Sequence, residues 1–177
     1  MRQRNRKPPQ PLDPASLERL ALFYVGRYAT TRAKLRTYLA RKLRERGWIE
    51  GLADPVDSLV ERLSTLGYVD DAAFAMSRAA SFQRRGFGER RLAQALGAAG
   101  IAPTESEAAR TQARDGALES ALRFAERKRI GPFAAERPDR KSREKAFAAM
   151  IRAGHAAEVI KKIVDLAPGE VPESDSM

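Results

Sequence analysis

Residues 35–48 read LRTYLARKLRERGW, and the fold can be worked out from this stretch. Three leucines recur every fourth residue, on one side of a helix with 3.6 residues per turn: Leu35, Leu39 and Leu43. Gly47 follows them and suits the left-handed backbone at which helices commonly end. Trp48 then serves as a packing anchor, a more common role for a large aromatic than base stacking. The stretch predicts a helix that begins after Thr30 or Thr31, ends at Gly47 and packs through its leucines.

The same spacing of two apolar residues, a glycine and an anchor residue returns twice. It occurs at 39–48, 92–101 and 146–155, and the glycines lie 53 and 54 residues apart. Helical patterns precede the three copies at 16–29, 71–85 and 117–129, and others follow them at 54–66, 104–115 and 156–166. A three-helix unit of about 50 residues is too small to bury much apolar surface alone. Such a period is therefore typical of stacked repeats.

We therefore predict an all-α fold of tandem three-helix repeats, each similar to a helix-turn-helix unit, in an elongated and curved array. The expected repeats are 15–68, 69–116 and 117–167. Residues 1–14 are expected to form a disordered basic arm and residues 168–177 a disordered tail. Ser16 is the expected cap of the first helix, and Asp54 with Pro55 the expected start of the third.

Two adjacent carboxylates, Asp70 and Asp71, lie within LGYVDDAAFAMSRAASF at residues 66–82. A catalytic or metal-binding pair would need further bases or ligands, and the neighbouring residues are alanine, phenylalanine, methionine and arginine. We interpret Asp70 as the cap of the following helix and Asp71 as a charge favoured by the helix dipole. The apolar stripe of that helix is expected at Ala72 or Ala73, Met76 and Ala79 or Ala80.

The charge of the chain is concentrated near its N-terminus. Residues 1–50 contain 13 lysines and arginines against 4 acidic residues, whereas the whole chain contains 33 against 23. This asymmetry indicates a polyanionic partner: nucleic acid, an acidic protein surface or an anionic membrane. An ordinary solvated arm on an arginine-rich protein is the alternative.

Composition argues against an enzyme. Cysteine is absent, which removes thiolate chemistry and fits a reducing compartment. The single histidine, His155, cannot build a conventional Ser-His-Asp triad or a histidine metal cluster. No phosphate-binding glycine motif, apolar span of 18 residues or secretory signal is present. We expect no cofactor, no metal, no membrane insertion and no catalytic residue.

Three stretches give the chain a resemblance to the RecX family of recombination regulators: LRTYLARKLRERGW, LVERLSTLGYVDDAAFA and GERRLAQALGAAGI. The middle one is the most specific, and the residues that match its signature are Gly67, Tyr68, Asp70, Asp71, Phe74 and Ala75. The resemblance covers about residues 16–166. The third repeat departs from the pattern, because His155 stands where the family usually has an aromatic residue after the glycine.

The resemblance implies a cytoplasmic regulator without a catalytic centre. Members of the family bind the RecA recombinase filament on single-stranded DNA, lie in its groove and suppress its growth and activity. The implied setting is homologous recombination, DNA repair and the SOS response. The alternative from another class is a plain helical DNA-binding protein of helix-turn-helix type. We expect a monomer, because no large apolar dimer face is evident.

Two basic clusters are the candidate binding sites. Opposite the leucines of 35–43, Lys34, Arg41 and Arg44 form one stripe, with Arg36 toward its border. The second cluster lies in FQRRGFGERRL and comprises Arg84, Arg85, Arg90 and Arg91. Gly86 and Gly88 are expected to make the joint between them tight and mobile. Both clusters could contact DNA phosphates or the carboxylates of a protein partner.

Overall fold

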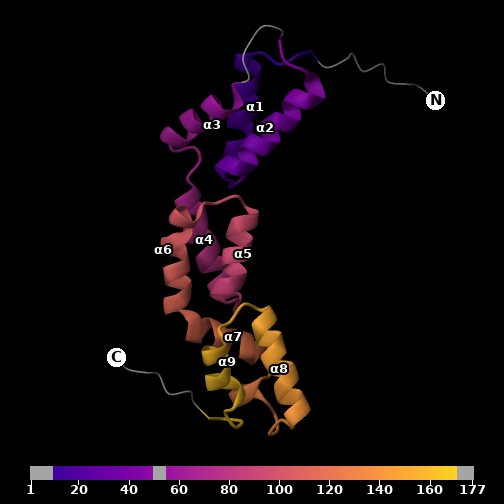
Figure 1. Cartoon of the computed structure of the whole chain (residues 1–177), viewed down its shortest axis with the longest axis vertical. Coiled ribbons are helices and arrows are strands. Elements are labelled where there is room, and N and C mark those ends of the chain that lie inside the picture. The colour runs from indigo at the N-terminus through magenta and orange to yellow at the C-terminus, as the bar shows by residue number, and fades with distance from the viewer. Residues whose placement is uncertain (1–9, 50–54, 171–177) are drawn as a thin grey trace, which may run out of the picture. The chain divides into compact units, whose positions relative to one another are not determined.

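The computed structural model describes residues 10–49 and 55–170. Within these ranges the chain is helical, and its only β pairing is an isolated bridge between Leu12 and Trp48. This confirms the predicted all-α class and the order of three-helix repeats. The first set of helices is α1 (Pro14–Arg27), α2 (Arg32–Arg46) and α3 (Val56–Thr65), and the second is α4 (Asp71–Arg84), α5 (Glu89–Ala98) and α6 (Pro103–Asp115). The third set is α7 (Ala117–Lys128), the short 3-10 helix η1 (Gly131–Phe133), α8 (Arg140–Arg152) and α9 (Ala157–Val164). Figure 1 labels the α-helices of the three sets.

The chain divides into two compact units, Met1–Phe74 and Ala75–Met177. The first contains α1–α3, and the second contains α5–α9 together with most of α4. The repeat boundaries at residues 68 and 116 and the elongated, curved arrangement of the repeats stay predictions.

The core of the first unit is built from leucines on three helices. Leu17 and Ala21 of α1 meet Leu35 and Leu39 of α2, with α3 packed on the same cluster. Partly buried side chains complete it, among them Leu20, Tyr24, Leu43 and Trp48. The leucine stripe of α2 and the packing role of Trp48 are therefore confirmed.

The ordered structure begins earlier than we predicted. Leu12 is fully buried, its backbone N–H donates to the carbonyl of Gly47 at 2.9 Å, and its own carbonyl accepts from Ile49 at 3.2 Å. The expected arm at 1–14 is therefore wrong for residues 10–14, because Leu12 gives them a place in the core. The remainder of that expected arm lies outside the described residues.

Helix caps explain where the helices of this unit begin and end. The Asp13 carboxylate accepts from the backbone N–H of Ser16 at 2.6 Å, so Asp13 and not Ser16 caps α1. The Thr31 hydroxyl accepts from the N–H of Lys34 at 3.2 Å and caps α2, whose end at Gly47 has φ +80° as predicted. Pro55 occupies the N-cap position of α3, and the predicted cap Asp54 lies outside the described residues.

The second unit has its main core between α7, α8 and α9. Phe124 of α7, Met150 of α8 and Ile160 and Ile163 of α9 are buried together. The segment between α7 and α8 contains η1, and the N–H of Gly169 donates to the carbonyl of Pro132 at 2.9 Å. The first residues of the expected tail at 168–177 therefore bond to η1, whereas residues 171–177 lie outside the described part.

The buried side of α4 differs from the predicted stripe. Ala75, Ala79 and Phe82 are buried, whereas Met76 is 39 % exposed. The alanine-rich sequence leaves the phase of the stripe open, because several faces of the helix carry small apolar residues. The buried face also begins at a carboxylate, Asp71, which an apolar pattern cannot reveal.

Candidate partner-binding surfaces

The two adjacent carboxylates each hold the start of a helix. Asp70 accepts from the backbone N–H of Ala73 at 2.8 Å and caps α4, as predicted. Asp71 is only 5 % exposed and reaches α2 instead, where it accepts from the backbone N–H of Arg32 at 2.9 Å and from its side-chain Nε at 3.4 Å. The first N–H groups of a helix have no hydrogen-bond partner within that helix, and Asp71 supplies one for the N–H of Arg32 at the start of α2. The pair is structural, and it fixes the helix that carries the first basic cluster.

On α2 the predicted stripe is partly neutralised by its neighbours. Arg41 pairs with Glu45 at 2.8 Å, and Arg36 pairs with Asp57 at the start of α3. The Lys34 ammonium lies 5.1 Å from the centre of the Phe74 ring. Among the described residues, Arg44 has no such partner and is exposed, so it is the most available cation of the four.

A group of three tyrosines beside this stripe was missed in the sequence. The rings of Tyr24 and Tyr38 stack with centroids 4.2 Å apart, and Tyr28 tilts against Tyr24 at 5.3 Å. Cations cover the group: Arg41 lies 5.5 Å and Lys42 5.9 Å from the Tyr38 ring, and Arg27 lies 5.9 Å from the Tyr28 ring. Aromatic rings with cations above them can bind stacked bases and phosphates. The four-residue spacing of Tyr24 and Tyr28 could have indicated that these two rings lie on one side of α1. The stack itself could not be predicted in this way, because Tyr38 comes from α2.

In the second cluster, arginines surround one aromatic ring. Arg91 lies 4.2 Å, Arg85 5.1 Å and Arg127 of α7 6.0 Å from the centre of the Phe87 ring. Arg84 and Arg90 are exposed, and within the described ranges their side chains form no ion pair. The structure thus brings Arg85 and Arg91 together and adds Arg127, which no sequence pattern indicated.

The glycines of this cluster make a tight joint, as predicted, whereas its expected mobility stays a prediction. A Cβ at Gly88 would lie 2.2 Å from the carbonyl oxygen of Gly154, and one at Gly86, where φ is +67°, would lie 2.8 Å from the backbone nitrogen of Phe124. The N–H of Gly88 donates to Ala153 at 2.9 Å, and the Ser120 hydroxyl donates to the Phe87 carbonyl at 2.8 Å. The glycines allow close backbone contact within the second unit.

His155 occupies the anchor position of the third repeat. It is 2 % exposed, its Nε2 lies 3.3 Å from the carbonyl oxygen of Gly86, and its ring centre lies 5.7 Å from that of Phe124. Its Nδ1 is buried without a hydrogen-bond partner in the described structure. Burial lowers the pKa of His155 below its usual range, and the bond to Gly86 opposes this only in part. The side chain therefore fills the aromatic position as a neutral ring.

In the ranges 10–49 and 55–170, no three potential metal-ligating side chains converge on one point. No helix among them has the length and apolar character needed to cross a bilayer.

These features define a class, that of all-α proteins with tandem three-helix repeats and basic, aromatic-rich surfaces. A family model described as "RecX, second three-helix domain" matches residues 70–109. The chain is 34 % identical to "Regulatory protein RecX" of Myxococcus xanthus over 94 % of each chain. It is 32 % identical to the protein of that name from Agrobacterium fabrum, over 86 % of this chain and 84 % of that one. The chain belongs to the RecX family of regulatory proteins.

Solved structures agree with this fold. The crystal structure of RecX from Lactobacillus salivarius matches with a TM-score of 0.61 at 17 % identity, over 83 % of this chain and 91 % of that one. A second structure, titled "Crystal structure of regulatory protein RecX", matches with a TM-score of 0.60 at 22 % identity, over 85 % and 73 %. At these identities the likeness supports the fold alone.

Proposed function

We propose that this protein binds the filament that a RecA-class recombinase forms on single-stranded DNA and restrains its growth and activity. The observation that carries the proposal is the 34 % identity to a RecX regulatory protein along nearly the whole chain. In this proposal the protein acts in the cytoplasm as a monomer, without cofactor or metal, and catalyses no reaction of its own.

Two basic surfaces support contact with a polymer. Arg44 and its neighbours lie on the first unit, whereas Arg90 and the arginines around Phe87 lie on the second. A filament repeats the same acidic features along its length, so two surfaces on one chain can engage it together. Simultaneous engagement raises affinity without requiring a strong individual contact.

The test is ATP hydrolysis by the recombinase on single-stranded DNA, with this protein added in substoichiometric amounts. Loss of hydrolysis under these conditions is the expected result, because one bound molecule can block many subunits of a growing filament. Inhibition that begins only when the DNA itself is saturated would contradict the proposal and indicate competition for DNA.

Charge reversal locates the contact. Arg41→Glu combined with Arg44→Glu is expected to weaken inhibition while the helical circular dichroism is unchanged. The matched control is Lys141→Glu with Arg152→Glu, which makes the same charge change at two exposed residues of α8. Equal inhibition by both double variants would remove the α2 surface from the binding site.

Direct DNA binding is a second candidate function, and the tyrosine group favours it. Stacked rings with Arg41, Lys42 and Arg27 over them offer both base-stacking faces and phosphate partners. Tyr28, which is 51 % exposed, can be replaced by alanine with little loss of core packing. Weaker binding of a labelled oligo-dT by Tyr28→Ala, with a steep salt dependence, would support this function.

A further inference from the structure

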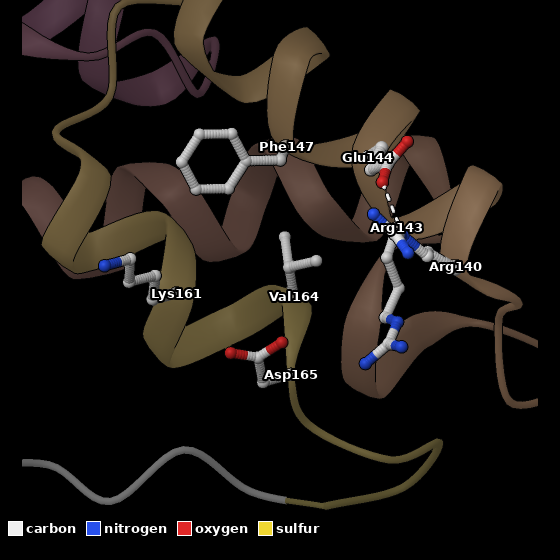
Figure 2. A pocket seen from close by; sticks show the side chains of 7 residues that line it. All are labelled: Arg140, Arg143, Glu144, Phe147, Lys161, Val164 and Asp165. Carbon is white, nitrogen blue, oxygen red and sulfur yellow. Dashed lines mark hydrogen bonds and ion pairs between the residues drawn. The ribbon is translucent and has the colours of Figure 1, made fainter.

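A groove with a basic rim and an apolar floor lies on the third repeat. One depression of about 360 Å³ is formed between α8 and α9. Phe147 of α8 and Val164 of α9 form its floor, and in Figure 2 Lys161 lies to one side of them and Arg143 to the other. A second depression of about 320 Å³ shares Arg143 and Val164 with the first, so the two adjoin, and together they are called the groove.

Basic side chains dominate this groove. The lining cations are Arg140, Arg143 and Lys161 in the first depression, with Lys128, Arg129 and Lys145 added in the second. Only two acidic residues, Glu144 and Asp165, line the two depressions. Glu144 is already paired with Arg140 at 3.0 Å, as Figure 2 shows.

Two of these cations are available to a ligand. The side chains of Arg143 and Lys161 form no hydrogen bond or ion pair within the described part of the chain, and both residues are exposed. The nearby carboxylate of Asp139 interacts with Arg143 at longer range, but its closest partner is the backbone N–H of Ser142 at 2.7 Å. An acidic ligand could therefore bind both cations without first breaking a contact between them and the protein.

The backbone beside the groove is held in a conformation that arginine seldom adopts. Arg129 ends α7 with φ +53° and ψ +52°, and it is the one described residue other than glycine with a positive φ. Glycine or asparagine would fit this position with less strain. A conflict between residue and backbone of this kind often marks a functional position, and here it places an arginine in the lining of the groove.

The mixture of charges favours a peptide over a nucleic acid. A nucleic acid strand carries one negative charge at every phosphate and would bring several of them close to Asp165 and Glu144. In a peptide, the carboxylates can be limited to the positions that face the cations, and an apolar side chain can pack on Phe147 and Val164. Buried apolar contact of this kind is also what anchors short peptides in grooves.

We propose that this groove docks a short acidic segment of a partner protein. One aromatic or aliphatic side chain of the segment lies between Phe147 and Val164, and flanking carboxylates pair with Arg143 and Lys161. The inference goes beyond the proposed function, because it concerns α8 and α9 and none of the residues in the two predicted basic clusters. A filament-binding defect and a peptide-binding defect are thus separable.

The probe is a fluorescein-labelled peptide with one carboxylate on each side of a phenylalanine, Gly-Ser-Asp-Gly-Phe-Gly-Glu-Ser-Gly, whose binding to the full chain is followed by anisotropy. Arg143→Glu combined with Lys161→Glu is expected to weaken binding about tenfold or more, because two charge-assisted contacts become repulsive. Lys141→Glu with Arg152→Glu makes the same charge change outside both depressions and should alter the dissociation constant less than about twofold. Circular dichroism verifies that all variants fold.

A change in the peptide tests the apolar floor without altering the protein. Replacing the phenylalanine of the peptide by serine should weaken binding about tenfold, as expected for losing one buried aromatic side chain. An unchanged affinity would overturn the groove as a docking site, since it would leave only non-specific attraction between charges.

Two further outcomes would assign the groove to another occupant. If unlabelled oligo-dT displaced the peptide and lost affinity in the same double variant, the groove would be a nucleic-acid surface. The acidic stretch 171–177 of this chain contains Glu173 and Asp175 and is the other competitor. If Glu173→Lys with Asp175→Lys raised peptide affinity about tenfold, the occupant would be this stretch instead of a partner. Either result overturns the proposal.

Discussion

Asp71 shows how much one buried carboxylate contributes to this fold. Its oxygens accept from the backbone and side chain of Arg32, 39 residues away in the sequence. Asp70 next to it is exposed and accepts only within its own helix. Two identical side chains in adjacent positions therefore make contacts of different range, and their removal should have different consequences.

Asp71→Ala should lower the free energy of unfolding by more than Asp70→Ala. Loss of the Asp70 cap is expected to cost about 0.5–2 kcal/mol. Loss of Asp71 leaves the N–H of Arg32 without its partner in a partly buried site, which costs about 1–3 kcal/mol, with more expected from the lost charge pairing. Urea unfolding of both variants measures the difference. A larger effect at Asp70 would contradict the assignment, and loss of filament inhibition without loss of stability would give the pair a functional role.

His155 makes stability depend on pH in a defined direction. Because burial lowers its pKa in the folded protein, the unfolded chain binds the proton more readily, and stability falls as the pH drops through the usual histidine range. The carboxylates whose pKa values are lowered, Asp13, Glu45, Glu107 and Asp139, lose their contribution only at a lower pH.

His155→Phe is therefore expected to remove most of the loss of stability between about pH 7 and pH 5. The phenylalanine keeps an aromatic ring against Phe124 and eliminates the unpartnered Nδ1. Thermal unfolding of both proteins across this interval is the measurement. A pH profile identical to that of the natural chain would show that another group is responsible.

At the scale of the helices, local signals predicted several boundaries, although the cap of α1 is Asp13 and not the predicted Ser16. Gly47 and Thr31 bound α2 as expected, and the cap at Asp70 was found. Contacts between distant segments could not be predicted in this way. The bond from Asp71 to α2 and the contact of Gly88 with Gly154 each join residues that lie far apart in the sequence. They depend on how the helices pack, and no local sequence pattern indicates that packing.

The candidate surfaces also differ in whether they lie on one helix or combine several. The helical period of α2 and its buried leucines could be predicted from the sequence, whereas the basic stripe as a binding surface stays a prediction. The tyrosine stack, the ring of arginines around Phe87 and the groove on the third repeat each combine two or more helices. Arg127 illustrates the difficulty, because 36 residues separate it from Arg91 and both lie over the same ring.

The contact between α5 and the end of α8 gives a sharp test of packing between these elements. Gly88→Ala should destabilise the protein by roughly 3 kcal/mol or more, because its Cβ would lie 2.2 Å from the Gly154 carbonyl oxygen and the backbone must move. Gly97→Ala is the matched control: beyond the backbone of its own helix, no atom would lie within 4 Å of the added Cβ, and alanine within α5 should stabilise by about 0.5–1 kcal/mol. Equal effects measured by urea unfolding would contradict the close contact.

At the scale of the whole molecule, the proposed function requires both basic surfaces to act on one filament. Arg44 and Arg90 represent these surfaces, one in each compact unit. Reversing either charge breaks no side-chain hydrogen bond, ion pair or ring contact within the described structure, so a change in binding reflects the partner. Sites that contribute independently to one binding event have additive free energies.

Arg44→Glu and Arg90→Glu should therefore each weaken binding to a preformed recombinase filament, and the double variant should weaken it by about the product of the two factors. Cosedimentation with filaments held by a non-hydrolysable ATP analogue gives the three affinities, and Lys141→Glu with Arg152→Glu controls for net charge. If one single variant bound normally and the double variant matched the other, the filament would contact only one unit. The remaining basic surface would then need a different partner, because its cations would contribute nothing to the filament complex.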